Sequence, residues 1–529
     1  MCDKGIPTSN KPTRREFILK AGLTAAGAAL AESGLPMIAQ TKPDRTHFSP
    51  PKDIWLVPHD ILPLPDNAFA ITLQGLVNRT QPRVWMRAGS MYGIIQNQLE
   101  RQGVRFHEVK SVWELLKVFH KEIKGAILCQ VNSPSMNVAT SLCGPMNAVA
   151  LDESLQPLAE KNGLKILLDA RRMDEKQTFE RYRQRFAKGI ALEQTVAGNG
   201  SAFVRDYAVA HNAFTYYTTD HAFRREVARE LSPDAIFYGW GPDEYGWIED
   251  LSSENATGVA SDWNVNLSAL QHIPSRNPLH RPRRPLPKKE DGVRYVAFVM
   301  TDGDNIQWLC GSFVGNPSYW GSPLRGQFPM TWEVSPMLTL TAPRVLEYLY
   351  DTAKENEGFV TGAGVPGYTY IHYQTDPVSV ADQAAPILTK ADLPYVGIIN
   401  ANEGNLRESI PLLRLPNVRA VLYKDYAPYN RHQGRMFWYD GKPCISFKFA
   451  LWEGLMSPQQ VAQGVSQMPA SPLKDENSYA LVTVHAWSYG SIGGPLEAVR
   501  QTISMLPANT RVVTADQLIE RMIANLRKR

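Results

Sequence analysis

Two carboxylates and an amide directly follow an apolar run near the middle of the chain. The run Tyr295–Met300 ends in the loop Thr301-Asp302-Gly303-Asp304-Asn305. A buried strand that ends in acids is typical of α/β proteins, which keep their active sites at the carboxyl ends of parallel strands. The loop therefore predicts acid–base chemistry, although Asp, Gly and Asn also favour a plain tight turn. It matches only part of a calcium-binding loop, because the distal Glu of that pattern is missing.

Further acids and aromatic residues recur just after the strands that the sequence predicts downstream. The candidates for catalysis are Asp302, Asp304, Glu333, Glu403, Glu453 and His485. The candidates for substrate binding are Asn305, Trp308, Trp332, Tyr368, Tyr370, Asn402, Trp452 and Trp487, with Asp243 and Glu244 reaching in from the preceding domain. Because the ends of parallel strands meet at one edge of a sheet, we expect these side chains to share a cleft.

Glycoside hydrolysis needs two such carboxylates, one as acid and the other as nucleophile or as base on water. We expect Asp302 or Asp304 to pair with one of Glu453, Glu333 and Glu403. Aromatic faces would stack on the sugar, while His485 and the tyrosines would orient it. The expected ligand is therefore a carbohydrate.

Two other interpretations remain open. The acids after the first strand and His485 could hold a divalent metal whose bound water attacks an ester or amide, as in a polysaccharide deacetylase-like hydrolase. The paired histidines expected after the second strand of such a protein are absent, so we assign no metal ligand and expect no cofactor outside this alternative. The other interpretation is a glycan-binding protein without catalysis.

Strands alternate with helices along the chain, which predicts an α/β fold with parallel sheets. In the region 48–272 we expect two or three small α/β subdomains. Their predicted strands are Ile54–Val57, Arg83–Met86, Gly125–Gln130, Leu164–Leu168 and Ala235–Tyr238, and their predicted helices are Asn67–Asn78, Tyr92–Gln102, Val112–His120 and Glu175–Lys188.

The segment 273–292 is rich in Pro and Arg and is predicted to be a linker. Beyond it, about eight short apolar strands predict a C-terminal (β/α) TIM-like barrel over residues 293–529, which would be the catalytic domain. These strands are Tyr295–Met300, Met330–Val334, Phe359–Gly362, Tyr395–Ile399, Ala420–Tyr423, Ser446–Phe449, Tyr479–His485 and Arg511–Val513. A hairpin over Arg435–Ile445 interrupts the pattern.

The N-terminus predicts export. Thr13–Lys20 carries a twin-arginine signature, and the following apolar run Ala21–Leu30 is too short to span a bilayer. We expect residues 1–39 to be a signal peptide read by the twin-arginine translocation machinery of a bacterium. The mature chain would then act in the periplasm or outside the cell, without a stable membrane anchor.

The remaining bulk properties exclude little else. The formal net charge is +4 and no long basic stripe occurs, so we expect no nucleic-acid partner. The cysteines of the mature chain are scattered without metal-type spacing and are predicted to be buried free thiols.

At these landmarks the chain resembles the "GxGYxYP putative glycoside hydrolase" family. Similar segments are Tyr295–Trp308, Trp332–Pro336, Ala342–Tyr350 and Gly367–Tyr370, and in the N-terminal part Thr72–Arg79, Gly239–Gly241 and Asp262–Ser268. The chain departs from the name-giving motif, with Val365 in place of its first Gly and Ile371 in place of its Pro. The resemblance implies a TIM-like C-terminal barrel behind smaller α/β domains, and it implies no catalytic assignment.

Overall fold

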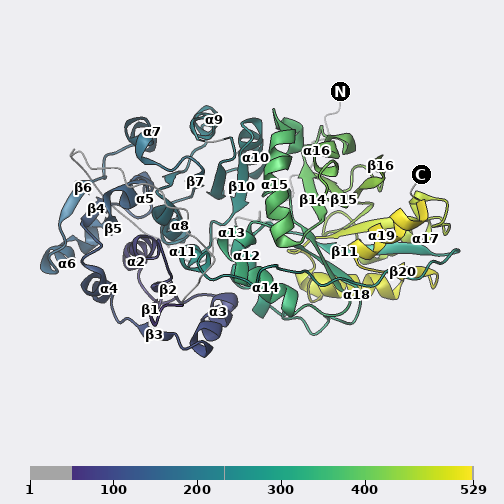
Figure 1. Ribbon diagram of the computed structural model, residues 1–529, viewed down its shortest axis with the longest axis horizontal. Coiled ribbons are helices and arrows are strands. Elements are labelled where there is room, and N and C mark those ends of the chain that lie inside the picture. The colour runs from purple at the N-terminus through teal and green to yellow at the C-terminus, as the bar shows by residue number, and fades with distance from the viewer. Residues whose placement is uncertain (1–49, 232, 527–529) are drawn as a thin grey trace, which may run out of the picture.

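The structure of this chain is a computed structural model that describes residues 50–231 and 233–526. The predicted signal peptide lies outside the described residues. Two lobes follow one another along the long axis of the molecule, an N-terminal lobe (residues 50–272) and a C-terminal lobe (residues 293–526) (Figure 1). None of the helices within the described ranges has the length and apolar character needed to cross a membrane.

The N-terminal lobe contains three small parallel sheets. Their orders are β2-β1-β3, β5-β4-β6 and β10-β9-β7-β8. The strands are β1 (Asp53–Val57), β2 (Val84–Met86), β3 (Arg105–Glu108), β4 (Gly125–Cys129), β5 (Ala148–Asp152), β6 (Ile166–Asp169), β7 (Ile190–Glu193), β8 (Phe214–Tyr216), β9 (Ile236–Gly239) and β10 (Thr257–Ala260).

Ten helices of this lobe are described within residues 50–231 and 233–272. They are α2 (Leu64–Val77), α3 (Ser90–Arg101), α4 (Val112–Phe119), α5 (Pro134–Met146), α6 (Gln156–Lys161), α7 (Glu175–Tyr182), α8 (Arg205–His211), α9 (His221–Glu230), α10 (Glu244–Ser253) and α11 (Leu267–Leu270). The expected long helix Glu175–Lys188 is wrong, because α7 ends at Tyr182. The chain then tightens into a 3-10 turn, and the Ala187 amide donates to the Asn212 carbonyl on the way into β7.

The C-terminal lobe contains two further sheets, ordered β13-β12-β11-β19-β18 and β14-β15-β17-β16, with β20 pairing β11. All pairs are parallel except β16 with β17. The strands are β11 (Arg294–Met300), β12 (Met330–Val334), β13 (Glu357–Thr361), β14 (Tyr395–Asn400), β15 (Ala420–Asp425), β16 (Met436–Tyr439), β17 (Lys442–Ser446), β18 (Phe449–Leu451), β19 (Tyr479–Val484) and β20 (Thr510–Val512). The helices are α12 (Ile306–Cys310), α13 (Leu338–Thr341), α14 (Pro343–Asp351), α15 (Pro377–Ala391), α16 (Ile410–Leu413), α17 (Pro458–Ser466), α18 (Pro495–Ser504) and α19 (Ala515–Leu526).

The expected closed barrel is not confirmed, because hydrogen-bonded ladders do not join these two sheets. At the seam between β13 and β14, the Thr361 hydroxyl donates to the Gly397 carbonyl and accepts from the Gly397 amide. The single strand expected over Ser446–Phe449 is also wrong. It is split into β17 and β18, because the Phe447 amide bonds to Tyr423 of β15 while the Lys448 amide bonds to Leu481 of β19.

Both sheets nevertheless face a shared apolar interior. One cluster joins residues of β11, β13, β14, β15, β17 and β19 with α19, among them Tyr295, Leu422, Leu481 and Leu518. Alternate residues of each strand point to opposite faces, so the other face of β11 contributes Val296, Phe298 and Met300 to the main core. The two sheets therefore curve around α19, and their carboxyl ends lie on one side.

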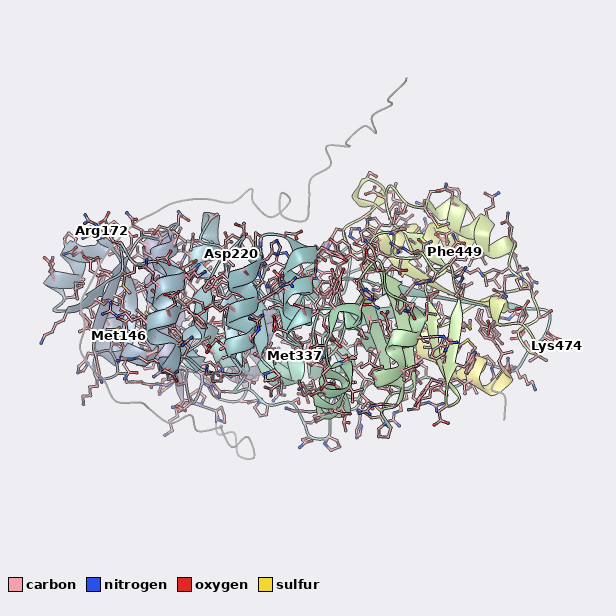
Figure 2. All side chains as sticks on the ribbon, turned by 90° about the horizontal axis from the view of Figure 1, so that it is seen from above. Met146, Arg172, Asp220, Met337, Phe449 and Lys474 are labelled. Carbon is pink, nitrogen blue, oxygen red and sulfur yellow. The ribbon has the colours of Figure 1, made fainter. Side chains whose placement is uncertain are left out.

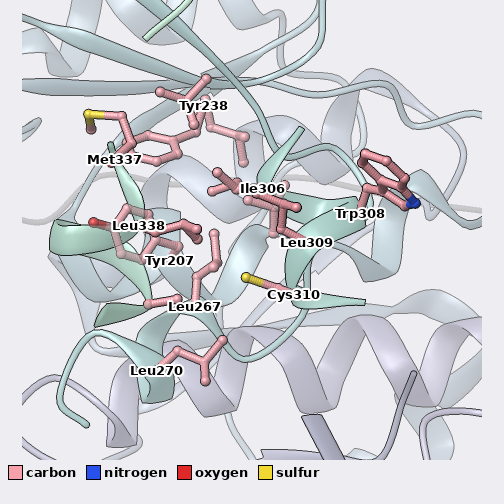
Figure 3. Packing of buried hydrophobic residues seen from close by; sticks show 14 of the residues in the cluster. Tyr207, Tyr238, Leu267, Leu270, Ile306, Trp308, Leu309, Cys310, Met337 and Leu338 are labelled. Atoms are coloured by element: carbon pink, nitrogen blue, oxygen red, sulfur yellow. The ribbon is translucent and has the colours of Figure 1, made fainter. Parts of the chain in front are cut away.

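The two lobes pack closely. Figure 3 shows Tyr207, Tyr238, Leu267 and Leu270 of the N-terminal lobe packed with Ile306, Leu309, Cys310, Met337 and Leu338 of the C-terminal lobe. In the view of Figure 2, Met337 lies between Asp220 and Phe449 along the long axis, and side chains fill the space around it. A backbone bridge between Gly258 of β10 and Tyr368 adds two hydrogen bonds of 3.0 and 2.8 Å. A large apolar interface of this kind holds domains in one arrangement.

Residues 273–292, predicted to be a linker, form neither helix nor strand. They run along the C-terminal lobe, where Arg281 pairs with Asp516 at 2.9 Å and Arg284 donates to the Glu357 carbonyl.

Candidate functional site

The loop 301–305 lies directly on the ends of the neighbouring strands. A Cβ atom on Gly303 would stand 1.8 Å from the Glu333 carbonyl oxygen, and one on Gly362 would stand 2.5 Å from the Asp304 amide nitrogen. Only glycine permits such close approach of backbone to backbone. Asp302 itself has a φ of +67°, a left-handed conformation that Asp tolerates better than most residues. The two acids are thereby held over β12 and β13.

Asp302 is held by two donors. Its Oδ2 accepts from the Thr301 hydroxyl at 2.5 Å and its Oδ1 accepts from the indole Nε1 of Trp487 at 3.0 Å. Hydrogen bonds donated to a carboxylate favour its charged form. Trp487 is 39% exposed and its ring packs against Trp308, at 4.8 Å between centroids. Asp302 is therefore a carboxylate of fixed orientation beside an exposed aromatic ring.

Glu333 lies behind the loop and is ion-paired with Lys424 of β15. Both side chains are 1% exposed. Burial raises the pKa of Glu333 to about 7, with Lys424 opposing the shift and the nearby Asp304 and Asp302 adding to it. Glu333 is thus coupled to both acids of the loop, although its burial keeps it from touching a ligand directly.

A row of rings crosses the carboxyl ends of the strands. This aromatic row consists of Tyr245, Tyr426, Tyr429, Trp452 and His485, whose successive centroids are 5.1, 6.1, 4.2 and 3.5 Å apart. The last two steps are parallel stacks, with interplanar angles of 15° and 7°. All five side chains are partly exposed. The row presents the kind of surface on which sugars or other flat ligands stack.

Tyr368 and Tyr370 tie this row to the N-terminal lobe. The Tyr368 hydroxyl donates to Glu244 at 3.0 Å, and its ring meets the Tyr370 ring at 5.6 Å. The Tyr370 amide donates to the Ser252 hydroxyl. Both rings are buried, at 2% and 0% exposure, so they support the row from beneath.

Three further predicted residues are exposed or partly exposed near the aromatic row. Glu403 is exposed and accepts from the hydroxyls of Tyr373 and Tyr245. Asn402 precedes it, and its carbonyl accepts from Arg431. Glu453 is also exposed, and its amide donates to the Ser488 hydroxyl, which itself bonds to Nδ1 of His485 at 2.7 Å.

Four predicted residues have packing or capping roles in the structure. Trp332 is 1% exposed between Phe313 and Trp320, so it cannot stack on a ligand. Its neighbour Glu333 points to the opposite face of β12, as alternation in a strand requires. Trp308 is buried behind Trp487, and Asn305 bonds within its own loop. Asp243 caps the N-terminus of α10.

The sequence did not single out Tyr245, Tyr373 or Tyr429. The available signals were that Tyr245 follows Glu244 directly and that Tyr373 lies three residues beyond Tyr370. Tyr429 lies on a loop after β15, where no periodic pattern points to it.

Cysteines and metal-type clusters add nothing to the site. Cys129, Cys143, Cys310 and Cys444 are free and buried, as the sequence predicts. Within the part of the chain that the structure describes, no three His, Cys, Asp or Glu side chains are gathered so as to hold a metal ion.

Comparisons with known proteins give matches along most of the chain. Residues 292–522 match the model of the "GxGYxYP putative glycoside hydrolase C-terminal domain", residues 190–272 that of the "GxGYxYP third domain", and residues 123–186 that of the "GxGYxYP_N second domain". No curated protein matches the chain.

One solved structure is similar over nearly the full length. It is described as a putative hydrolase from Bacteroides thetaiotaomicron VPI-5482, is 26% identical, and aligns with a TM-score of 0.83 over 93% of this chain and 100% of that chain. A putative polysaccharide deacetylase from Mycobacterium smegmatis is 12% identical over 46% of this chain and 96% of that one. Its TM-score of 0.32 is too low to carry an argument.

Proposed function

Because the chain belongs to the GxGYxYP family, we propose that it is a glycoside hydrolase with its active site at the carboxyl ends of the C-terminal strands. The observation that carries the proposal is the segment His485–Trp487. Trp487 donates to Asp302, and His485, two residues earlier, stacks on Trp452 of the aromatic row. A carboxylate of fixed orientation and a stacking surface for sugar are thereby joined in one place.

In the proposed mechanism Asp302 is the ionised carboxylate, since two donors favour its charge. It acts as the nucleophile or as the base on water. Glu453 is the partner acid that protonates the leaving oxygen, because it is exposed and directly follows Trp452, which stacks on His485. Glycosidases need such a pair on opposite sides of the scissile bond.

The test is release of reducing ends from a panel of polysaccharides. Asp302→Asn and Glu453→Gln are each expected to lower kcat by about 10²- to 10⁴-fold, the range for loss of an acid–base group. The matched control is Glu355→Gln, an exposed residue ahead of β13 at the other end of the strands, which should leave kcat unchanged. Turnover that survives both site variants would refute the assignment, and stoichiometric bound metal lost in Asp302→Asn would favour a deacetylase-like reaction.

We also propose export through the twin-arginine machinery, which rests on the sequence of Thr13–Lys20. Replacing Arg14 and Arg15 by Lys should keep the chain in the cytoplasm of a bacterial host that exports the unaltered chain. Cell fractionation measures this, and unchanged export of the double variant would overturn the proposal.

A further inference from the structure

The Glu403 carboxylate stands at one end of the aromatic row, held weakly. Its Oε2 accepts from the hydroxyls of Tyr373 at 3.3 Å and Tyr245 at 3.4 Å. Both are longer than an ordinary O–H···O hydrogen bond. An ionised carboxylate has about four acceptor sites, so Glu403 has capacity left for a donor from a ligand.

Tyrosine rings lie beside this carboxylate. The Tyr245 ring lies 5.1 Å from Tyr370 and 5.1 Å from Tyr426, and it meets Tyr373 edge-on at 6.4 Å. Rings attract cations through their faces, most strongly where the cation is partly desolvated. A carboxylate beside partly exposed tyrosines is therefore suited to a positively charged group.

The groups near Glu403 also favour a positively charged ligand. Burial raises the pKa of Tyr245 and of Tyr373, and the carboxylates of Glu403 and Glu249 contribute to both shifts. The basic side chains nearby bond to groups other than Glu403.

The basic side chains near Glu403 each have another partner. Arg431 donates to the Asn402 carbonyl, Arg225 pairs with Asp250 and Glu249, and His372 pairs with Glu408. Within residues 50–231 and 233–526, no Lys, Arg or His forms an ion pair with Glu403.

We propose that Glu403, Tyr245 and Tyr373 form a subsite for a protonated amine, and that the substrate is a glycan carrying free amino groups. This rests on the proposed function in so far as the bound glycan is also the one cleaved. The subsite spans both lobes, because Tyr245 comes from α10 and the other two follow β13 and β14. The N-terminal lobe would thus contribute directly to specificity.

The experiment compares two pairs of hexasaccharides by calorimetric titration of the purified full chain at pH 5.5. Each pair has one backbone, β-1,4-linked glucosamine or α-1,4-linked galactosamine, with its amines free or N-acetylated. We expect at least one free-amine hexamer to bind about tenfold more tightly than its acetylated counterpart, with the difference shrinking at high salt.

Variants of Glu403 then locate the effect. Glu403→Gln should weaken binding of the free-amine hexamer about tenfold and leave the acetylated one unchanged, whereas Glu403→Asp should retain most of the preference. Glu355→Gln, an exposed residue remote from the row, should change neither. Equal binding within both pairs, no binding at all, or a preference that survives Glu403→Gln would each overturn the inference.

Release of reducing ends is scored separately. Amine-dependent binding without cleavage would support the subsite and count against the hydrolase. Cleavage of a neutral glycan that depends on Asp302 but not on Glu403 would support the hydrolase and overturn the subsite.

Discussion

Two buried ion pairs, one in each lobe, use the same charges in different ways. In the N-terminal lobe Arg224 of α9 is 2% exposed and bonds Glu193 at 2.8 Å through both Nε and Nη2, and Asp250 at 2.6 Å through Nη1. In the C-terminal lobe the single ammonium of Lys424 faces Glu333, with the acids of the loop 301–305 nearby.

The difference lies in how completely the carboxylates are satisfied. The guanidinium is a planar fork with five donors, whereas the ammonium is a point charge. Glu193 has both oxygens bonded by that fork, and Asp250 has Arg225 as a second cation. Glu333 has one lysine as its partner and two acids nearby, and its pKa is raised, first by burial, to about 7. Burial raises the pKa of Glu193 as well, but the Arg224 fork bonds both of its oxygens and opposes that shift. The pKa of Glu333, at about 7, lets this group gain or lose a proton near neutral pH.

The largest expected effect is on the complete network. Arg224→Met leaves Glu193 and Asp250 buried without their shared cation, so we expect a loss of about 3–5 kcal/mol in the free energy of unfolding of the N-terminal lobe. Urea unfolding at pH 7.5 measures it. Arg224→Lys should recover only part of the loss, because a point charge cannot reproduce the fork. Full recovery by Lys would show that the forked shape of the guanidinium adds no stability, and the proposed difference between the arginine and lysine pairs would be wrong.

A smaller loss is expected at the lysine pair. Lys424→Met strands one carboxyl group, which can take up a proton, so we expect about 1–3 kcal/mol at pH 8 and less at pH 5. Urea unfolding at the two pH values compares them. An equal loss at both pH values would mean that Glu333 does not take up a proton between pH 8 and pH 5.

The pH dependence of the unaltered chain should carry the signature of Glu333. Its folded pKa of about 7 lies above its ordinary value of 4.5. Between these values the folded chain keeps a proton that the unfolded chain has released, so this group's contribution is complete below pH 4.5 and is lost as the pH rises through about 7.

Glu333→Gln should remove that slope, about 2 kcal/mol between pH 5 and pH 7.5. Urea midpoints across the range, for the unaltered chain and the variant, measure it. Parallel curves for the two chains would place the titration elsewhere. Glu355→Gln is the control, because Glu355 is exposed and lies at the other end of the strands.

The sequence predicted the strands with long apolar runs well, and for a physical reason. The strand Met330–Val334 has the expected bounds, because it is a continuous pattern bounded by Pro329 and by Ser335-Pro336. The helix Pro134–Met146 and the short strands Ala148–Asp152, Phe214–Tyr216 and Thr257–Ala260 were missed. Segments that are buried all round carry no alternation by which to recognise them.

For the site, the sequence could indicate strand ends but not partners. It placed Asp302 and Glu333 at neighbouring strand ends, yet it could not show that Trp487 orients one and that Lys424 neutralises the other. It also assigned Trp332 and Glu333 to one cleft, although adjacent residues of a strand face opposite sides. Contacts between distant segments, such as Tyr245 with Glu403, have no signal in a single sequence.

The smallest effect is expected for a third ion pair, Arg229 with Glu254, which tests whether burial separates the first two. Arg229 lies on the same helix as Arg224 and donates to Glu254 through Nε and Nη2, but its side chain is 64% exposed. Water already solvates the arginine there, so Arg229→Met should cost much less stability than Arg224→Met. Urea unfolding at pH 7.5 compares it directly with Arg224→Met. The two arginines lie on one helix and form the same forked contact, so they differ mainly in burial. An equal cost for Arg229→Met and Arg224→Met would mean that the forked geometry, not burial, provides the stability.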